Sequence, residues 1–112
     1  MSQLNDALAD RAVVYRSLRV DAELLVTVNG RFDGSVAPRA YEDAAQALDD
    51  GVTDIVIDLS DADEIDEGAV AVLCALAITA TKRGGKMFLW LSPSEPVQIL
   101  DPSEVRGALN AG

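Results

Sequence analysis

The chain has 112 residues, enough for one packed domain that buries roughly 65% of the surface its unfolded form exposes. Apolar residues make up 49% of it, which fits a globular protein and not a disordered one. Nineteen acidic residues against nine basic ones give a formal net charge of −10, which repels phosphate backbones and anionic lipid heads. We therefore expect neither nucleic-acid binding nor insertion into a membrane, and no apolar run is long enough for a membrane span or a secretory signal. The cytoplasm is the expected location.

The first part of the chain predicts an antiparallel hairpin. Residues 2–10 indicate a short helical lead-in. Residues 12–18 and 23–32 are rich in β-branched and leucine side chains on either side of the turn RVDA at 19–22, as in two strands joined by a tight connection.

A helix is expected over residues 36–50. Ser35 is a suitable N-cap, and Pro38 is tolerated in the first helical turn. Apolar positions recur at helical spacing on one side, and Gly51 is the expected stop.

The rest of the chain predicts alternating strands and helices. Residues 54–59 alternate less than the first two strands, with the apolar run Ile55-Val56-Ile57 typical of a central strand, and the acidic segment 60–66 is expected as a loop. A helix over 67–83 and a strand over 86–91 follow. Two short helices are expected after them, over residues 95–100 and 102–109, the second capped by Asp101.

These elements predict an α/β fold with a mixed sheet of four or five strands, an N-terminal hairpin and helices packed on the sheet. Residues 1–112 are expected to form a single domain, with its core over about 12–100, a lead-in over 1–11 and a short tail or helix over 101–112. Sites in such sheets lie beyond the carboxyl ends of parallel strands, which places one at the loop 60–66.

Catalytic chemistry has little support in the sequence. Histidine is absent, no nucleotide-binding or nucleophile motif is present, and Cys74 lies in an apolar helix as a core side chain, so no cofactor is expected. The acidic run from Asp58 to Glu67 lacks the glycine and glutamate spacing of an EF-hand, which indicates a solvated loop. A magnesium-dependent phosphotransfer enzyme is the minor alternative.

The helix over 67–83 is apolar on all sides. Val70, Leu73 and Cys74 lie on the stripe assigned to the sheet, with Ala77 and Thr81 further along it. Val72 and Leu76 then lie on the opposite, outward side. Either a partner protein contacts that side or the C-terminal helices cover it.

Several motifs resemble the STAS domain, the family of anti-sigma-factor antagonists and of the cytoplasmic domains of sulfate-type transporters. Residues 29–33 (NGRFD), with Ala37-Pro38 after them, are similar to the family's G-x-L-D…A-P stretch. Residues 55–60 (IVIDLS) resemble its central VVLDLS strand, and residues 65–73 (IDEGAVAVL) align without a gap on I-D-S-S-G-L-G-V-L.

The turn KRGGK at 82–86 also fits the family, so the resemblance covers about residues 12–100. Family members usually continue past the segment matching 96–100 into a further strand and a terminal helix. The shorter end here favours self-association, including a homodimer.

The resemblance implies a regulatory protein partner. In antagonists of this family, a partner that is both a kinase and an anti-sigma factor phosphorylates the serine after the motif's aspartate. Asp66 matches that aspartate, but Glu67 replaces the serine and Gly68 the residue after it. Glu67 cannot be phosphorylated by a serine kinase, so it is either a mimic of phosphoserine or the mark of constitutive binding.

We therefore expect a non-catalytic, anti-sigma factor antagonist-like protein whose partner resembles an anti-sigma factor or serine kinase. A soluble subunit of a membrane transporter complex is the alternative. The expected contact surface consists of Asp33, Asp66, Glu67, Gly68, Val72 and Leu76.

Overall fold

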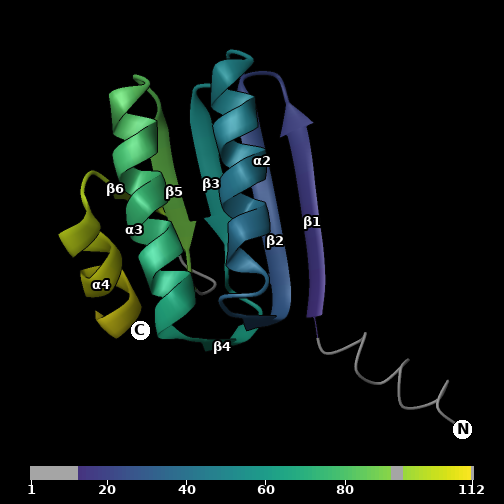
Figure 1. Cartoon of the computed structure of the whole chain (residues 1–112), viewed down its shortest axis with the longest axis vertical. Helices are drawn as coiled ribbons and strands as arrows, with labels where there is room; N and C mark the ends of the chain where they lie inside the picture. The colour runs from purple at the N-terminus through teal and green to yellow at the C-terminus, as the bar shows by residue number, and fades with distance from the viewer. Residues whose placement is uncertain (1–12, 92–94, 112) are drawn as a thin grey trace, which may run out of the picture.

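The structure, a computed structural model, describes residues 13–91 and 95–111 of the chain. They form one mixed β-sheet with helices α2 and α3 lying across one face, and α4 beside α3 (Figure 1). Five strands follow the order β1-β2-β3-β5-β6, and β4 pairs with β2. The elements are β1 (Val13–Val20), β2 (Glu23–Phe32), α2 (Ala37–Asp49), β3 (Asp54–Asp58), β4 (Ala62–Ile65), α3 (Glu67–Lys82), β5 (Lys86–Trp90), β6 (Val97–Ile99) and α4 (Pro102–Ala111).

The N-terminal hairpin is confirmed, with a shorter turn than expected. Strands β1 and β2 pair antiparallel up to Val20 and Glu23, which leaves only Asp21 and Ala22 as the connection. Asp21 has a φ of 54°, a left-handed conformation that aspartate tolerates better than most residues. The predicted lead-in over 2–10 lies outside the described residues.

The centre of the sheet is parallel. Strand β3 lies between β2 and β5, and it pairs parallel with both. Because parallel neighbours need a crossover connection, α2 and α3 each return the chain across the same face. Ile55, Val56 and Ile57 of β3 are all buried, as expected for a central strand.

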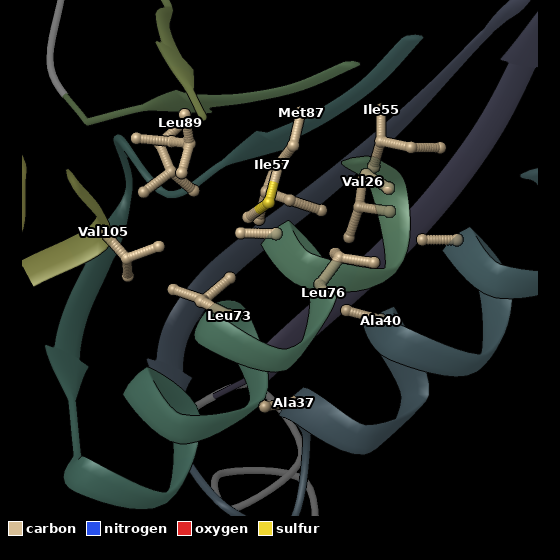
Figure 2. Close-up of a cluster of buried hydrophobic side chains, with 14 of the residues drawn as sticks. Val26, Ala37, Ala40, Ile55, Ile57, Leu73, Leu76, Met87, Leu89 and Val105 are labelled. Carbon is tan, nitrogen blue, oxygen red and sulfur yellow. The ribbon is translucent and has the colours of Figure 1, made fainter. Parts of the chain in front are cut away.

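The core lies between the sheet and the helices and is aliphatic. Figure 2 shows side chains from β2, β3 and β5 facing Leu73 and Leu76 of α3 and the small Ala37 and Ala40 of α2. Val105 of α4 is also fully buried in this cluster. Small residues on α2 let that helix pack close to its neighbours, while α3 supplies the larger leucine side chains.

The acidic segment 60–66 was expected to be a loop, which is wrong for Ala62–Ile65, the residues that form strand β4. Strand β4 pairs parallel with the last residues of β2, with Phe32 opposite Ile65. Strand β2 has ten residues and β3 only five, so the end of β2 extends past β3 and offers free backbone groups to the chain that follows. The register shifts between Gly30 and Arg31, where Gly30 has a φ of 93°.

The helix expected over residues 95–100 is also wrong. Val97–Ile99 form β6, which pairs antiparallel with β5 at the edge of the sheet. Val97 and Ile99 are β-branched and favour a strand, and the edge of β5 supplies the backbone partners. Helix α4 matches the helix expected over 102–109.

The outward side assigned to α3 is partly wrong as well. Leu76 is 0% exposed, because α3 is covered by the sheet on one side and by α2 on another. Val72 is half-buried, and Thr81, assigned to the sheet, is exposed. The side of α3 that carries Cys74 lies near α4, where the Sγ atom is 3.7 Å from the carbonyl oxygen of Pro102. A helix that is apolar all round has no dominant stripe, so periodicity alone does not define which side faces the sheet.

None of the described helices is long and apolar enough to cross a membrane.

Candidate functional site

The candidate site lies at the end of the sheet where β2 ends and α3 begins. The loop after β2 carries Asp33, Gly34 and Ser35, and β4 leads directly into Asp66 and Glu67. The backbone N–H of Asp66 donates a hydrogen bond to the carbonyl oxygen of Phe32 (3.4 Å), which holds the two segments together. Four of the six predicted contact residues, Asp33, Asp66, Glu67 and Gly68, therefore lie in one place.

Asp66 is the N-cap of α3. Its backbone is extended, and its Oδ1 atom accepts a hydrogen bond from the N–H of Ala69 at 2.8 Å. This satisfies one of the free N–H groups at the helix start. The Oδ2 atom lies 3.4 Å from the N–H of Gly34, so the same carboxylate also links the helix to the loop after β2.

Asp33 organises the loop before α2. Its Oδ1 atom accepts hydrogen bonds from the hydroxyl (2.6 Å) and N–H (2.9 Å) of Ser35 and from the N–H of Val36 (3.2 Å). Its Oδ2 atom accepts one from Nε of Arg31 at 2.5 Å. These hydrogen bonds, the Ser35 ones foremost, stabilise the charged form and lower the pKa of Asp33 from 3.8 to about 2.

The N-cap assigned to Ser35 is a further correction. Helix α2 begins one residue later than expected, with Val36 as the cap residue and no side-chain cap. Asp33 instead accepts the hydrogen bonds at the helix start: its carbonyl oxygen accepts from the N–H groups of Val36 and Ala37, and its Oδ1 atom accepts from the N–H of Val36. Ser35 donates its hydroxyl to Asp33 and does not cap the helix.

Glu67 projects from the first turn of α3. Its side chain is 81% exposed, and its one ion pair within the described chain is with Arg106 of α4, where Nη1 and Oε1 are 3.2 Å apart. Because Asp66 caps the helix, Glu67 is not needed for that role. Arg106 was missed at the sequence level, since a salt bridge between positions 39 residues apart leaves no local pattern.

An apolar groove lies beside this site, between α2 and α3. It has a volume of about 290 Å³ and is lined by Pro38, Tyr41, Glu42, Val72 and Ala75. Val72, one of the predicted contact residues, is therefore accessible from solvent. The groove is held in shape by a 2.8 Å hydrogen bond between the hydroxyls of Tyr41 and Thr79, which joins the two helices.

The charge at this end is mostly negative. Arg31 and Arg106 are the cations that pair with its carboxylates in the described chain. Among the described residues, no group of three or more potential ligands is placed to hold a metal ion. The carboxylates that gather at this end are Asp33, Asp61, Asp63, Glu64, Asp66 and Glu67.

Comparison with known families matches residues 16–89, more than half of the chain, to the family described as "Mlab, STAS domain". The chain is a STAS domain. A comparison with curated proteins found no match.

Solved structures share the fold of this STAS domain. SpoIIAA, a Bacillus cell fate determinant described as an anti-sigma factor antagonist, is 16% identical; 88% of this chain covers 84% of it, with TM-scores of 0.65 for the unphosphorylated and 0.64 for the phosphorylated form. A putative anti-sigma factor antagonist from Thermotoga maritima is 22% identical, with 87% of this chain covering 79% of it and a TM-score of 0.62. An anti-sigma factor antagonist from Mycobacterium paratuberculosis is 17% identical, with coverages of 88% and 94% and a TM-score of 0.58. At these identities the likeness concerns the fold.

Proposed function

We propose that this STAS domain is a non-catalytic regulatory protein that binds a protein partner through the start of α3, in the manner of an anti-sigma factor antagonist. Membership of the STAS family and the fold shared with proteins described as such antagonists support this proposal. The partner is an anti-sigma factor or a related kinase-like protein, and the complex forms in the cytoplasm.

The observation that carries the proposal is the exposure of Glu67 on an already capped helix. Asp66 caps the helix start, so the Glu67 carboxylate, 81% exposed and paired in the described chain with the exposed Arg106 alone, is accessible to another molecule. The positive end of the helix dipole favours a negative group there. The surface comprises Asp33, Asp66, Glu67 and Gly68, with Val72 in the adjoining groove; the buried Leu76 is not part of it.

Glu67 lies at the position where antagonists of this family carry the phosphorylated serine. A phosphoserine has about −1.5 to −2 charges and three acceptor oxygens, whereas glutamate has one charge and two oxygens. Arg106 offsets part of that single charge. Glu67 therefore reproduces only part of a phosphoserine, and the partner either reads it as the phosphorylated state or has a basic residue opposite it and binds constitutively.

The test begins with affinity purification of the full chain and mass spectrometry of the captured proteins. Affinity for the main partner is then measured for the wild type, Glu67→Gln, Glu67→Ser and the control Glu64→Gln, an exposed carboxylate on neighbouring β4. We expect the two Glu67 variants to change the dissociation constant at least about fivefold, because a charge at an interface centre is strongly coupled to its partner. Glu64→Gln should change it less than twofold.

The direction of the change in affinity distinguishes the two proposed roles of Glu67. Tighter binding by Glu67→Ser, with phosphorylation of the new serine by the partner, indicates a phosphoserine mimic. Weaker binding by both variants indicates constitutive binding. Equal affinities for all four proteins would contradict the proposed surface.

The identity of the partner separates the remaining alternatives. A permease or an ATPase subunit as the tightest partner would favour a soluble subunit of a transporter complex. Turnover of phosphoesters with magnesium would favour an enzyme. Self-association stays a prediction, and sedimentation analysis of the purified chain tests it.

A further inference from the structure

The face of the sheet opposite α2 and α3 is not covered by any helix of the described chain (Figure 1). An apolar row crosses four strands of this outer face. Leu18 of β1 lies opposite Leu25 of β2, Leu25 opposite Val56 of β3, and Val56 opposite Phe88 of β5. Leu18 is 58% exposed, so one end of the row is open to solvent.

The neighbouring row is charged. Glu23 of β2 lies opposite Asp54 of β3, and Asp54 lies opposite Lys86 of β5. Like charges directly opposite each other on neighbouring strands destabilise a sheet. None of these three side chains is in an ion pair with another described residue, Lys86 with Asp54 included.

A hollow of about 330 Å³ lies where the two rows meet. The half-buried Phe88 supplies most of its apolar surface, Val56, only 7% exposed, lies at its base, and Pro96, in the segment before β6, also lines it. Glu23, Asp54 and Glu95 supply carboxylates around it. The hollow thus combines an aliphatic and aromatic surface with three negative groups.

We propose that this hollow binds a lysine or arginine side chain of a protein partner, and that the outer face of the sheet is a second docking surface. The aliphatic stem of such a side chain fits the apolar surface, and its cation lies among the carboxylates and near the Phe88 ring. The carboxylates favour a basic residue. The apolar row beside the hollow favours a basic residue that has apolar neighbours in the partner protein.

This surface is distinct from the proposed Glu67 site. Glu23 and Asp54 begin β2 and β3, whereas Asp33 and Asp66 lie beyond the opposite end of β2. The surface also lies on the other face of the sheet from the groove between α2 and α3. The domain is therefore able to bind two proteins at once, one at each surface.

The first experiment titrates the full ¹⁵N-labelled chain with butylguanidinium and with butylurea, an uncharged molecule of nearly the same shape. We expect saturable amide shifts around Glu23, Asp54 and Phe88 with butylguanidinium and at least about threefold weaker binding of butylurea. Equal binding of the two molecules, or shifts spread over all acidic segments, would overturn the proposal.

Variants locate the site. Glu23→Gln/Asp54→Asn should weaken butylguanidinium binding about three- to tenfold, since each half-exposed ion pair contributes a modest amount. Glu95 lies outside the strands, so Glu95→Gln does not alter the sheet, and this variant should also weaken butylguanidinium binding. Lys86→Gln should strengthen binding, because it removes the cation beside Asp54. The control Glu64→Gln should leave binding unchanged, and a loss equal to that of the double variant would overturn the site.

A peptide distinguishes a protein partner from a free cation. Acetyl-Ser-Leu-Arg-Leu-Ser-amide should bind at least about threefold more tightly than butylguanidinium, because its leucines contact the apolar row. The same peptide with uncharged citrulline in place of arginine should bind more weakly than the arginine peptide. Equal affinity of the peptide and butylguanidinium would overturn the protein-partner assignment. So would a dimer in sedimentation experiments that Leu18→Ser dissociates, because a second copy would then occupy the face.

Discussion

Gly34 and Gly68 lie against each other where the loop after β2 meets the start of α3, and a Cβ added to Gly68 would lie 3.2 Å from the Cα of Gly34. That Cβ would also lie 3.3 Å from the Oδ1 atom of Asp66, the acceptor that caps the helix. The close approach of two backbones therefore brings Asp33 and Glu67 into one surface.

Gly68→Ala should destabilise the protein despite lying in a helix. Replacing glycine by alanine in a helix normally stabilises it by roughly 0.5–1 kcal/mol. At position 68 the new methyl group lies too close to the backbone of Gly34 and to the capping carboxylate of Asp66. We therefore expect the free energy of unfolding, measured by urea denaturation, to fall by about 0.5–1 kcal/mol.

Gly107→Ala in α4 is the matched control. A Cβ there meets nothing within 4 Å, and we expect a gain of about 0.5–1 kcal/mol. If both substitutions stabilised the protein by a similar amount, the loop after β2 would have moved to accommodate the new methyl group at position 68.

Asp66→Ala should cost about 1–2 kcal/mol of stability, because it removes the side-chain acceptor for the N–H of Ala69. Asp66→Asn retains an oxygen in that place and should cost less than about 0.5 kcal/mol. Urea denaturation at neutral pH measures both. Equal losses would mean that the negative charge, and not the hydrogen bond, makes Asp66 important to the fold.

Stability should fall between about pH 4 and pH 2 as Asp33 takes up a proton. The pKa of this group falls from 3.8 to about 2 in the folded chain, so its contribution is present above pH 4 and is lost as the pH approaches 2. Ser35→Ala removes the hydroxyl donor, and the pKa of Asp33 should rise toward its ordinary value.

Carboxyl-carbon NMR titration of the wild type and Ser35→Ala measures that pKa directly, and unfolding curves across the same range measure the loss of stability. An unchanged Asp33 titration in Ser35→Ala would mean that Arg31 and the backbone N–H groups suffice to hold the carboxylate charged.

Leu76→Ala should cost about 2–5 kcal/mol, because the side chain is fully buried and its removal leaves a cavity. Ile78→Ser, on the exposed side of the same helix, should change stability by less than about 0.5 kcal/mol. Thermal or urea unfolding compares the two. A small effect at Leu76 would contradict its place in the core.

The regular elements of this chain were predictable where local pattern and tertiary structure agree. The hairpin and α2 show apolar periods, β3 and α3 are continuous apolar runs of strand and helix length, and Gly51 and Gly84, both at positive φ, mark where α2 and α3 end. Strand β4 was missed because its acidic residues do not favour a strand, and β6 because three residues are too few for a recognisable pattern. Each forms because a neighbouring strand, β2 or β5, leaves backbone groups to be paired.

The candidate site was predictable in its chain-local part alone. Asp66 and Glu67 follow from the motif at a helix start, and Asp33 from the stretch NGRFD that resembles the family's. The pairing of Glu67 with Arg106 and the burial of Leu76 depend on where α4 and α2 lie beside α3. Those positions follow from long-range packing, for which a segment's own sequence carries no signal.

The order of the strands also has a consequence for how the chain folds. Strands β1 and β2 are joined by two residues, so they pair at little entropic cost, whereas β2, β3 and β5 meet only after the intervening chain has closed large loops. The hairpin should therefore be protected earliest in a pulse-labelling experiment. The middle of the sheet should acquire its protection only as both crossover helices dock.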